Sequence, residues 1–111
     1  MTFPRDYQVD APQASQVRAR TGLQLLEFGT GWCGHCQAAQ PLLQKLLGPF
    51  DQVPYQKIED GKGRPLGRAF AVKLWPTVVL LRDGEELARV VRPHQREDLQ
   101  PVLDALARAG A

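Results

Sequence analysis

The sequence predicts an α/β domain in which helices cover a β-sheet. An apolar run at residues 23–28 has the composition of a strand that is covered on both faces. Residues 37–47, which follow it closely, have helical spacing and consist of good helix formers. Later in the chain, a strand pattern rich in β-branched residues at 77–82 meets an Asp83-Gly84 hairpin turn and continues as an edge strand at 85–91. This alternation of strand and helix patterns indicates the α/β class.

Further elements are expected from local patterns. In chain order they are a short edge strand at residues 7–9, a helix at 11–20, a strand at 53–59, a short helix at 66–72 and a final helix with Leu99, Val102, Leu103 and Leu106 on one face. Pro12 suits the first turn of the first helix, and Thr21-Gly22 suits its end.

Length and charge narrow the classes of function. With 111 residues the chain can build one core, so we expect residues 1–111 to form a single domain. The formal net charge of +2 is too small to indicate nucleic-acid or membrane binding, and the chain lacks the glycine and lysine pattern of a phosphate loop. No apolar run is long enough for a membrane span or a signal-peptide core. We therefore expect a soluble monomer in the cytoplasm, or in the periplasm if a leader was removed from the precursor.

The two cysteines of the chain, Cys33 and Cys36, lie at the turn between the strand at 23–28 and the helix that follows. Unpaired backbone N–H groups and the positive end of the helix dipole favour a thiolate at Cys33. Cys36 lies three residues further on, on the same helix face, from which it can attack a mixed disulfide formed on Cys33. The spacing therefore predicts a redox-active dithiol.

Two other interpretations of the cysteine pair remain open. A structural zinc site needs four nitrogen or sulfur ligands, and the chain adds only His35 and His94, of which His35 lies between the cysteines. An inert pair of small core residues is the second, although a strand-to-helix position favours redox chemistry. We expect no metal and no cofactor beyond a redox-active disulfide between Cys33 and Cys36.

The segment Trp32-Cys33-Gly34-His35-Cys36 resembles the active-site pentapeptide of the thioredoxin superfamily, in the form that protein disulfide isomerase domains carry. Further matches follow the family's order across residues 20–108: an acidic residue before the first cysteine, a proline within the next helix, a cis-proline followed by threonine, and a hairpin turn. Here these are Glu27, Pro41, Pro76-Thr77 and Asp83-Gly84.

The resemblance implies the thioredoxin fold, a central mixed sheet of four to five strands flanked by helices on both faces. It also implies a thiol–disulfide oxidoreductase that reduces or exchanges disulfides in protein substrates and is recharged by a thioredoxin-reductase-like or other dithiol electron donor. Alternatives are a periplasmic or lumenal disulfide oxidase or isomerase, and a thioredoxin-fold module that binds partners without turnover.

By the resemblance, Cys33 attacks the substrate disulfide, Cys36 resolves the mixed disulfide and Glu27 accepts the Cys36 proton. A carboxylate in a buried strand is costly unless it is protonated or paired, which makes Glu27 a candidate proton carrier. Alternatively, Glu27 faces solvent at the strand end or is neutralised by Lys57. Because Tyr55 occupies the position of the family's lysine, we expect Lys57 to be a surface residue.

Residues around the dithiol are expected to set its potential and its partners. Gly34 and His35 stand where thioredoxins usually have Gly-Pro, and a partly protonated His35 should stabilise the thiolate and make the couple more oxidising. Trp32 is expected to be either an exposed platform for substrates or packed under the loop. Gly29 replaces an aromatic residue of the family, which should leave the site more open.

The later part of the chain is expected to supply the substrate groove. By the resemblance, Pro76 is cis, and the backbone of Trp75 is free to pair with an extended substrate strand. Arg92-Pro93 replaces a glycine of the family, so that docking is expected to favour acidic surfaces. His94 is expected to be an exposed residue near the start of the last helix.

Overall fold

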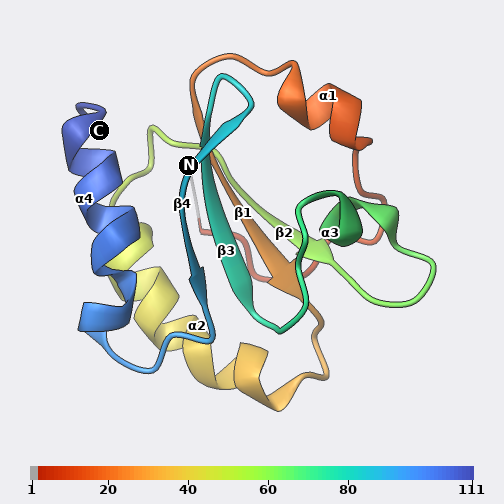
Figure 1. Ribbon diagram of the computed structural model, residues 1–111. Coiled ribbons are helices and arrows are strands. Elements are labelled where there is room, and N and C mark those ends of the chain that lie inside the picture. The colour runs from red at the N-terminus through yellow and green to blue at the C-terminus, as the bar shows by residue number, and fades with distance from the viewer. Residues whose placement is uncertain (1–2) are drawn as a thin grey trace.

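A four-stranded sheet forms the centre of the computed structural model, which describes residues 3–111 (Figure 1). The helices and strands are α1 (Ala14–Arg18), β1 (Leu23–Gly29), α2 (Gly34–Leu47), β2 (Tyr55–Glu59), α3 (Pro65–Ala69), β3 (Thr77–Arg82), β4 (Glu85–Val91), the 3-10 helix η1 (Arg96–Leu99) and α4 (Gln100–Arg108).

The sheet is mixed and has the strand order β2-β1-β3-β4. Strand β1 pairs with β2 in parallel and with β3 in antiparallel orientation, and β3 pairs with β4 through the expected hairpin. The edge strand expected at residues 7–9 is reduced to a single bridge between Gln8 and Ile58, at the outer edge of β2. This bridge fixes the N-terminal segment beside the sheet.

Helices cover both faces of the sheet, as predicted. Leu25, in β1, packs in a cluster with α2 and α4, whereas its neighbour Leu26 packs in a second cluster with α1 and α3. Successive strand residues face opposite sides of a sheet, which explains the division. Figure 1 shows the two pairs of helices on opposite sides of the strands.

The observed element bounds differ from the expected ones mainly at the helices. Helix α1 and helix α3 are shorter than the predicted helices at 11–20 and 66–72. Helix α2 begins at Gly34 rather than at residue 37, which places the dithiol at its N-terminal turn. No helix within residues 3–111 combines the length and the apolar character needed to span a lipid bilayer.

Candidate active site

The two cysteines lie at the start of α2. Cys33 is the N-cap residue, with extended backbone angles of φ −76° and ψ 121°, and its Sγ accepts a hydrogen bond of 3.3 Å from the Cys36 backbone N–H. The sulfur thus takes the place of the side-chain oxygen that commonly caps a helix. Both cysteines are free. The predicted position of Cys33 at the helix N-terminus is confirmed, and backbone N–H groups at such a terminus stabilise a thiolate.

The two cysteines differ in exposure, and the thiol of the more buried one, Cys36, is hard to ionise. Cys33 is 7% exposed, whereas Cys36 is 1% exposed. Burial is the main cause that raises the pKa of Cys36 to about 11, and the hydrogen bond with Cys33 raises it further, while hydrogen bonds with the Thr30 backbone and the Tyr7 side chain lower it. Cys36 is therefore protonated at neutral pH and must lose a proton to act as a nucleophile.

A buried polar cluster surrounds Glu27, whose exposed fraction is 0%. Its carboxylate accepts hydrogen bonds from the Tyr55 hydroxyl at 2.7 Å and the Gln40 amide at 2.9 Å, and a third from the Tyr7 hydroxyl. The interpretation that Glu27 faces solvent is therefore wrong. These donors replace the water that a buried carboxylate loses.

Lys57 is 3% exposed, so the expectation of a surface lysine is wrong. Its Cα is the register partner of Glu27, which directs both side chains to the same face of the sheet, under the N-terminal segment and α2. The Lys57 ammonium donates to the Arg5 carbonyl and to the Gln40 side-chain oxygen, both at 2.9 Å. Among residues 3–111 it forms no ion pair with Glu27, because the Gln40 amide lies between the two charges and bonds to each.

The glycine at position 29 does not open the site as expected, because Tyr7 fills the adjacent space. A Cβ at Gly29 would lie 2.8 Å from the Tyr7 hydroxyl oxygen and 2.6 Å from the Cys36 Sγ. The bridge at Gln8 holds the N-terminal segment at the sheet edge and so positions the tyrosine. Gly29 therefore permits a contact between Tyr7 and Cys36 that any larger residue would prevent.

Two tryptophans, Trp32 and Trp75, lie together on the surface next to the dithiol. Trp32 is 75% exposed, so the interpretation that it packs under the loop is wrong. Its ring meets that of Trp75 edge-on, with 5.8 Å between the centroids. The Trp75 indole N–H donates to Asp60 Oδ2 at 2.9 Å, which orients the ring. The peptide bond between Trp75 and Pro76 is cis, as the resemblance implied.

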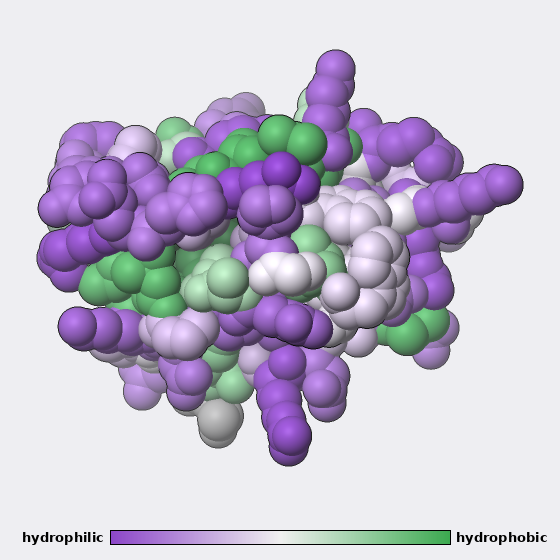
Figure 2. Space-filling model, turned by 90° about the horizontal axis from the view of Figure 1, so that it is seen from below, coloured by the Kyte–Doolittle hydropathy of each residue, from purple (hydrophilic) through white to green (hydrophobic). Residues whose placement is uncertain are grey.

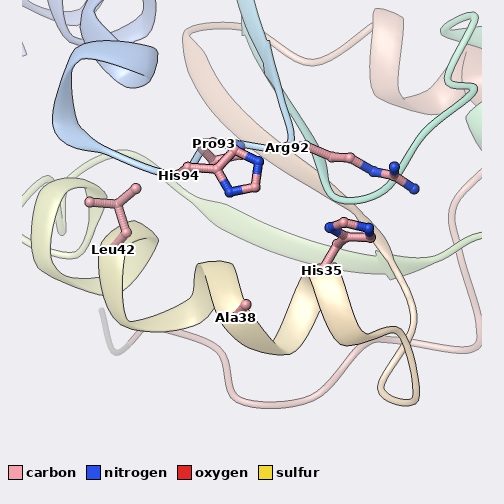
Figure 3. A pocket seen from close by; sticks show the side chains of 6 residues that line it. All are labelled: His35, Ala38, Leu42, Arg92, Pro93 and His94. Carbon is pink, nitrogen blue, oxygen red and sulfur yellow. The ribbon is translucent and has the colours of Figure 1, made fainter.

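A cavity of about 240 Å³ lies between the first turns of α2 and the segment after β4. Figure 3 shows the rings of His35 and His94 and the side chain of Arg92 around it, with Ala38, Leu42 and Pro93 completing the lining. Arg92 Nε donates to the Trp75 carbonyl at 2.8 Å, so that carbonyl is already bonded within the chain. His94 is exposed and donates its backbone N–H to Asp98, as expected of a residue near a helix start.

The surface that carries the dithiol is only partly hydrophilic. Figure 2 views the molecule from the end at which α2 lies, and a band of apolar and near-neutral side chains crosses this face between hydrophilic ones. Such a surface offers contact area to another protein.

Four residues of the site were not expected there from the sequence, namely Tyr7, Gln40, Tyr55 and Asp60. Gln40 had a detectable signal, since it is four residues after Cys36 on a helix and shares its face. Tyr7 had a weaker one, because a segment pairing with the edge of β2 brings it near Lys57. Part of the site thus depends on contacts between distant segments of the chain.

Within residues 3–111 there is no group of three or more His, Cys, Asp or Glu side chains that could hold a metal ion. The fold and the site define a class of protein, namely α/β domains with a dithiol at a helix N-terminus beside a cis-proline, whose chemistry is thiol–disulfide exchange. The thioredoxin family model matches residues 7–105. The chain belongs to the thioredoxin family, and it is a thiol–disulfide oxidoreductase with a CxxC pair.

Individual relatives agree with this assignment. The chain is 49% identical to thioredoxin 2 from Pseudomonas aeruginosa PAO1, whose structure in the reduced form matches with a TM-score of 0.82 over 96% of both chains. It is 31% identical over 86 residues to thioredoxin from Staphylococcus haemolyticus, covering 77% of this chain and 83% of that protein. It is 30% identical over 86 residues to thioredoxin H2-1 from Oryza sativa subsp. japonica, covering 78% of this chain and 62% of the rice protein.

Proposed function

We propose that the protein reduces disulfides in protein substrates, with Cys33 as the attacking and Cys36 as the resolving cysteine. The observation that carries this assignment is the asymmetry of the pair. The Cys33 sulfur caps the N-terminus of α2 and retains some exposure, whereas the Cys36 thiol is buried behind it. A substrate disulfide can therefore reach Cys33 first.

The reaction proceeds through a mixed disulfide. The Cys33 thiolate attacks one substrate sulfur and the other leaves as a thiolate. Cys36 then gives up its proton and attacks the Cys33 sulfur, which forms the Cys33–Cys36 disulfide and releases the second substrate thiolate. Glu27 takes up the Cys36 proton in this second step; its burial and its position within the same polar cluster as Cys36 support the role.

Substrate docking is assigned to the rim around Cys33. The exposed Trp32 ring offers apolar contact area, and Gly34 leaves open space beside the sulfur, since a Cβ at this position would meet no neighbour within 4 Å. Trp75 and Pro76 line the approach from the other side, where the Trp75 backbone can pair with an extended substrate segment. Because Arg92 already bonds the Trp75 carbonyl, a substrate would share or displace that bond.

Each turnover leaves the protein oxidised, so a dithiol donor of the thioredoxin-reductase type must restore the two thiols. A dithiol with no other cysteine in the chain suits the reducing environment of the cytoplasm, where we place the protein as a monomer. An exposed His35 near the dithiol would shift the couple toward a more oxidising potential, and this observation favours lumenal disulfide exchange as the second candidate function.

Reduction of insulin with dithiothreitol as the electron donor tests the proposal. We expect the protein to accelerate insulin precipitation and the Cys33→Ser variant to fall to the uncatalysed rate. Binding of partner proteins without turnover predicts equal rates with and without the protein. A titration of the dithiol against glutathione then separates a reductase from an oxidase by its reduction potential.

A further inference from the structure

The Tyr7 hydroxyl lies between the two groups that must exchange a proton. It donates a hydrogen bond to Glu27 Oε2, and its oxygen and the Cys36 Sγ both lie within 3 Å of the position that a Cβ at Gly29 would occupy, so the phenol and the thiol are neighbours. The Gln40 amide approaches the same phenol oxygen at 3.4 Å and donates to the same carboxylate oxygen at 2.9 Å. The phenol oxygen therefore lies next to the Cys36 sulfur and is hydrogen-bonded to the Glu27 carboxylate.

Two features of the chain hold the phenol in this place. Gly29 leaves the space into which the hydroxyl fits, since a Cβ there would lie within 3 Å of both Tyr7 and Cys36. On its other side, the ring of Tyr7 packs 4.3 Å from the Lys57 ammonium, measured to the ring centroid. This ammonium group is buried under the N-terminal segment and orients the tyrosine ring. It also orients Gln40, to whose side-chain oxygen it donates a hydrogen bond.

The Tyr7 hydroxyl stays protonated, so a proton can pass through it without the phenol becoming ionised. The pKa of Tyr7 is raised far above its usual range, first by burial and then by the charge of Glu27, so the phenol keeps a proton throughout. A phenol can nevertheless accept a proton at its oxygen while it passes its own proton to a neighbour. No tyrosinate has to form.

We propose that Tyr7 is a catalytic proton relay, which takes the Cys36 proton and gives its own hydroxyl proton to Glu27 as Cys36 attacks the mixed disulfide. The inference rests on the proposed function. The S–H bond of Cys36 and the disulfide bond to the substrate break, and the Cys36–Cys33 disulfide forms. The substrate leaves as a thiolate, Glu27 becomes a carboxylic acid, and Tyr7 ends as it began.

Tyr55 provides a matched comparison. Its hydroxyl donates to Glu27 at 2.7 Å, as that of Tyr7 does, but it bonds the other carboxylate oxygen, Oε1, and it is Tyr7 that approaches Gly29 together with the Cys36 Sγ. The titratable groups that face the Tyr7 phenol are Glu27 from β1, Lys57 and Tyr55 from β2, and Cys36 from α2. Arg5 and Asp6, which line the adjacent cavity of about 200 Å³ with Tyr7 and Cys36, complete the set.

The test uses stopped-flow reduction of dithiobis-nitrobenzoate, which releases one coloured thiol when Cys33 attacks and a second when Cys36 resolves. In Tyr7→Phe we expect the rate of the first phase to stay within about twofold of its rate in the unmodified protein. The second phase should be slower by about tenfold or more, as for loss of a general base. Tyr55→Phe should slow the second phase by less than about threefold. In Tyr7→Phe the effect of deuterated water on the second phase should also change, and thermal unfolding confirms that both variants are folded.

The outcomes separate the relay from the function on which it rests. If the second phase has the same rate in the unmodified protein and in Tyr7→Phe, the relay alone is overturned. The Cys36 proton would then leave through the cavity beside Tyr7 and Cys36. Equal losses in Tyr7→Phe and Tyr55→Phe would overturn it too, since both phenols would act only as donors to Glu27. Absence of the first phase in the unmodified protein would instead refute the proposed function.

Discussion

The two cysteines share one helical turn but have different surroundings. Cys33 lies at a rim made of exposed side chains, among them Trp32 and His35, that touches solvent and any docking protein. Cys36 lies against a buried polar cluster in which every described side chain has a hydrogen-bond partner, comprising Tyr7, Glu27, Gln40, Tyr55 and Lys57.

Under the proposed function, this difference divides the tasks of one motif. The rim selects the disulfides that reach Cys33 and affects the stability of its thiolate. The buried cluster lets Cys36 lose the proton that its pKa of about 11 would otherwise retain at neutral pH. Changes at the rim should therefore alter substrate affinity and potential. Changes in the buried cluster should alter the resolving step.

The sharpest way to separate the two cysteines is to remove one at a time. Cys36→Ser should accumulate a stable mixed disulfide between Cys33 and a protein substrate, because nothing resolves it, with multiple-turnover activity lost by a factor on the order of a hundred or more. Cys33→Ser should form almost no adduct at neutral pH. With a pKa of about 11, Cys36 is ionised to about one part in ten thousand at pH 7. Mass spectrometry of trapped complexes measures both results, and adducts on Cys36 in Cys33→Ser would contradict the assigned order.

The buried cluster is tested next by Glu27→Gln, which keeps the volume and the acceptor oxygen but removes the charge. We expect the resolving step to slow by roughly 10- to 100-fold, because the amide cannot take up the Cys36 proton. Rates should recover as the pH rises toward the Cys36 pKa of about 11, where the thiolate forms without a base. Stopped-flow traces across pH give both quantities. An unchanged rate and pH dependence would exclude Glu27 as the proton acceptor.

Much of the rim and of the fold could be predicted because local patterns determine them. The apolar run of β1, the β-branched residues of β3 and the Asp83-Gly84 turn are each specified within a few residues. The dithiol at the start of α2 is likewise local, and short-range geometry was enough for these features. The exposure of Trp32 was one of two interpretations that the sequence left open, and the structure decides between them.

The buried cluster could not be predicted in the same way, because its members come from separate segments. Lysine is typically a surface residue, so its type gave no sign that Lys57 is buried. Lys57 is buried because its register with Glu27 directs it under the N-terminal segment. Tyr7 belongs to a segment that forms just one bridge, so its local pattern was weak. The effect of Gly29 depends on Tyr7 and could not be inferred from the glycine alone.

On the rim, His35→Pro should lower the reduction potential. The substitution removes an exposed imidazole from the CxxC segment, and an imidazolium there would stabilise a thiolate at Cys33 and with it the reduced form. A shift of about 30 mV, equivalent to a tenfold change in the equilibrium with glutathione, is expected. The resolving rate should change much less than in Glu27→Gln, and a higher potential in His35→Pro would contradict this electrostatic explanation.

The smallest effect is expected for Trp32→Ala. Because Trp32 is 75% exposed, its removal should change the free energy of unfolding by no more than about 0.5 kcal/mol. It should raise the KM for a protein disulfide about three- to tenfold while leaving the reaction with a small aromatic disulfide nearly unchanged, since only a protein substrate is large enough to cover both tryptophan rings. Equal losses on both substrates would mean that Trp32 acts on Cys33 itself, and the division between a docking rim and a proton-handling interior would then have to be redrawn at this residue.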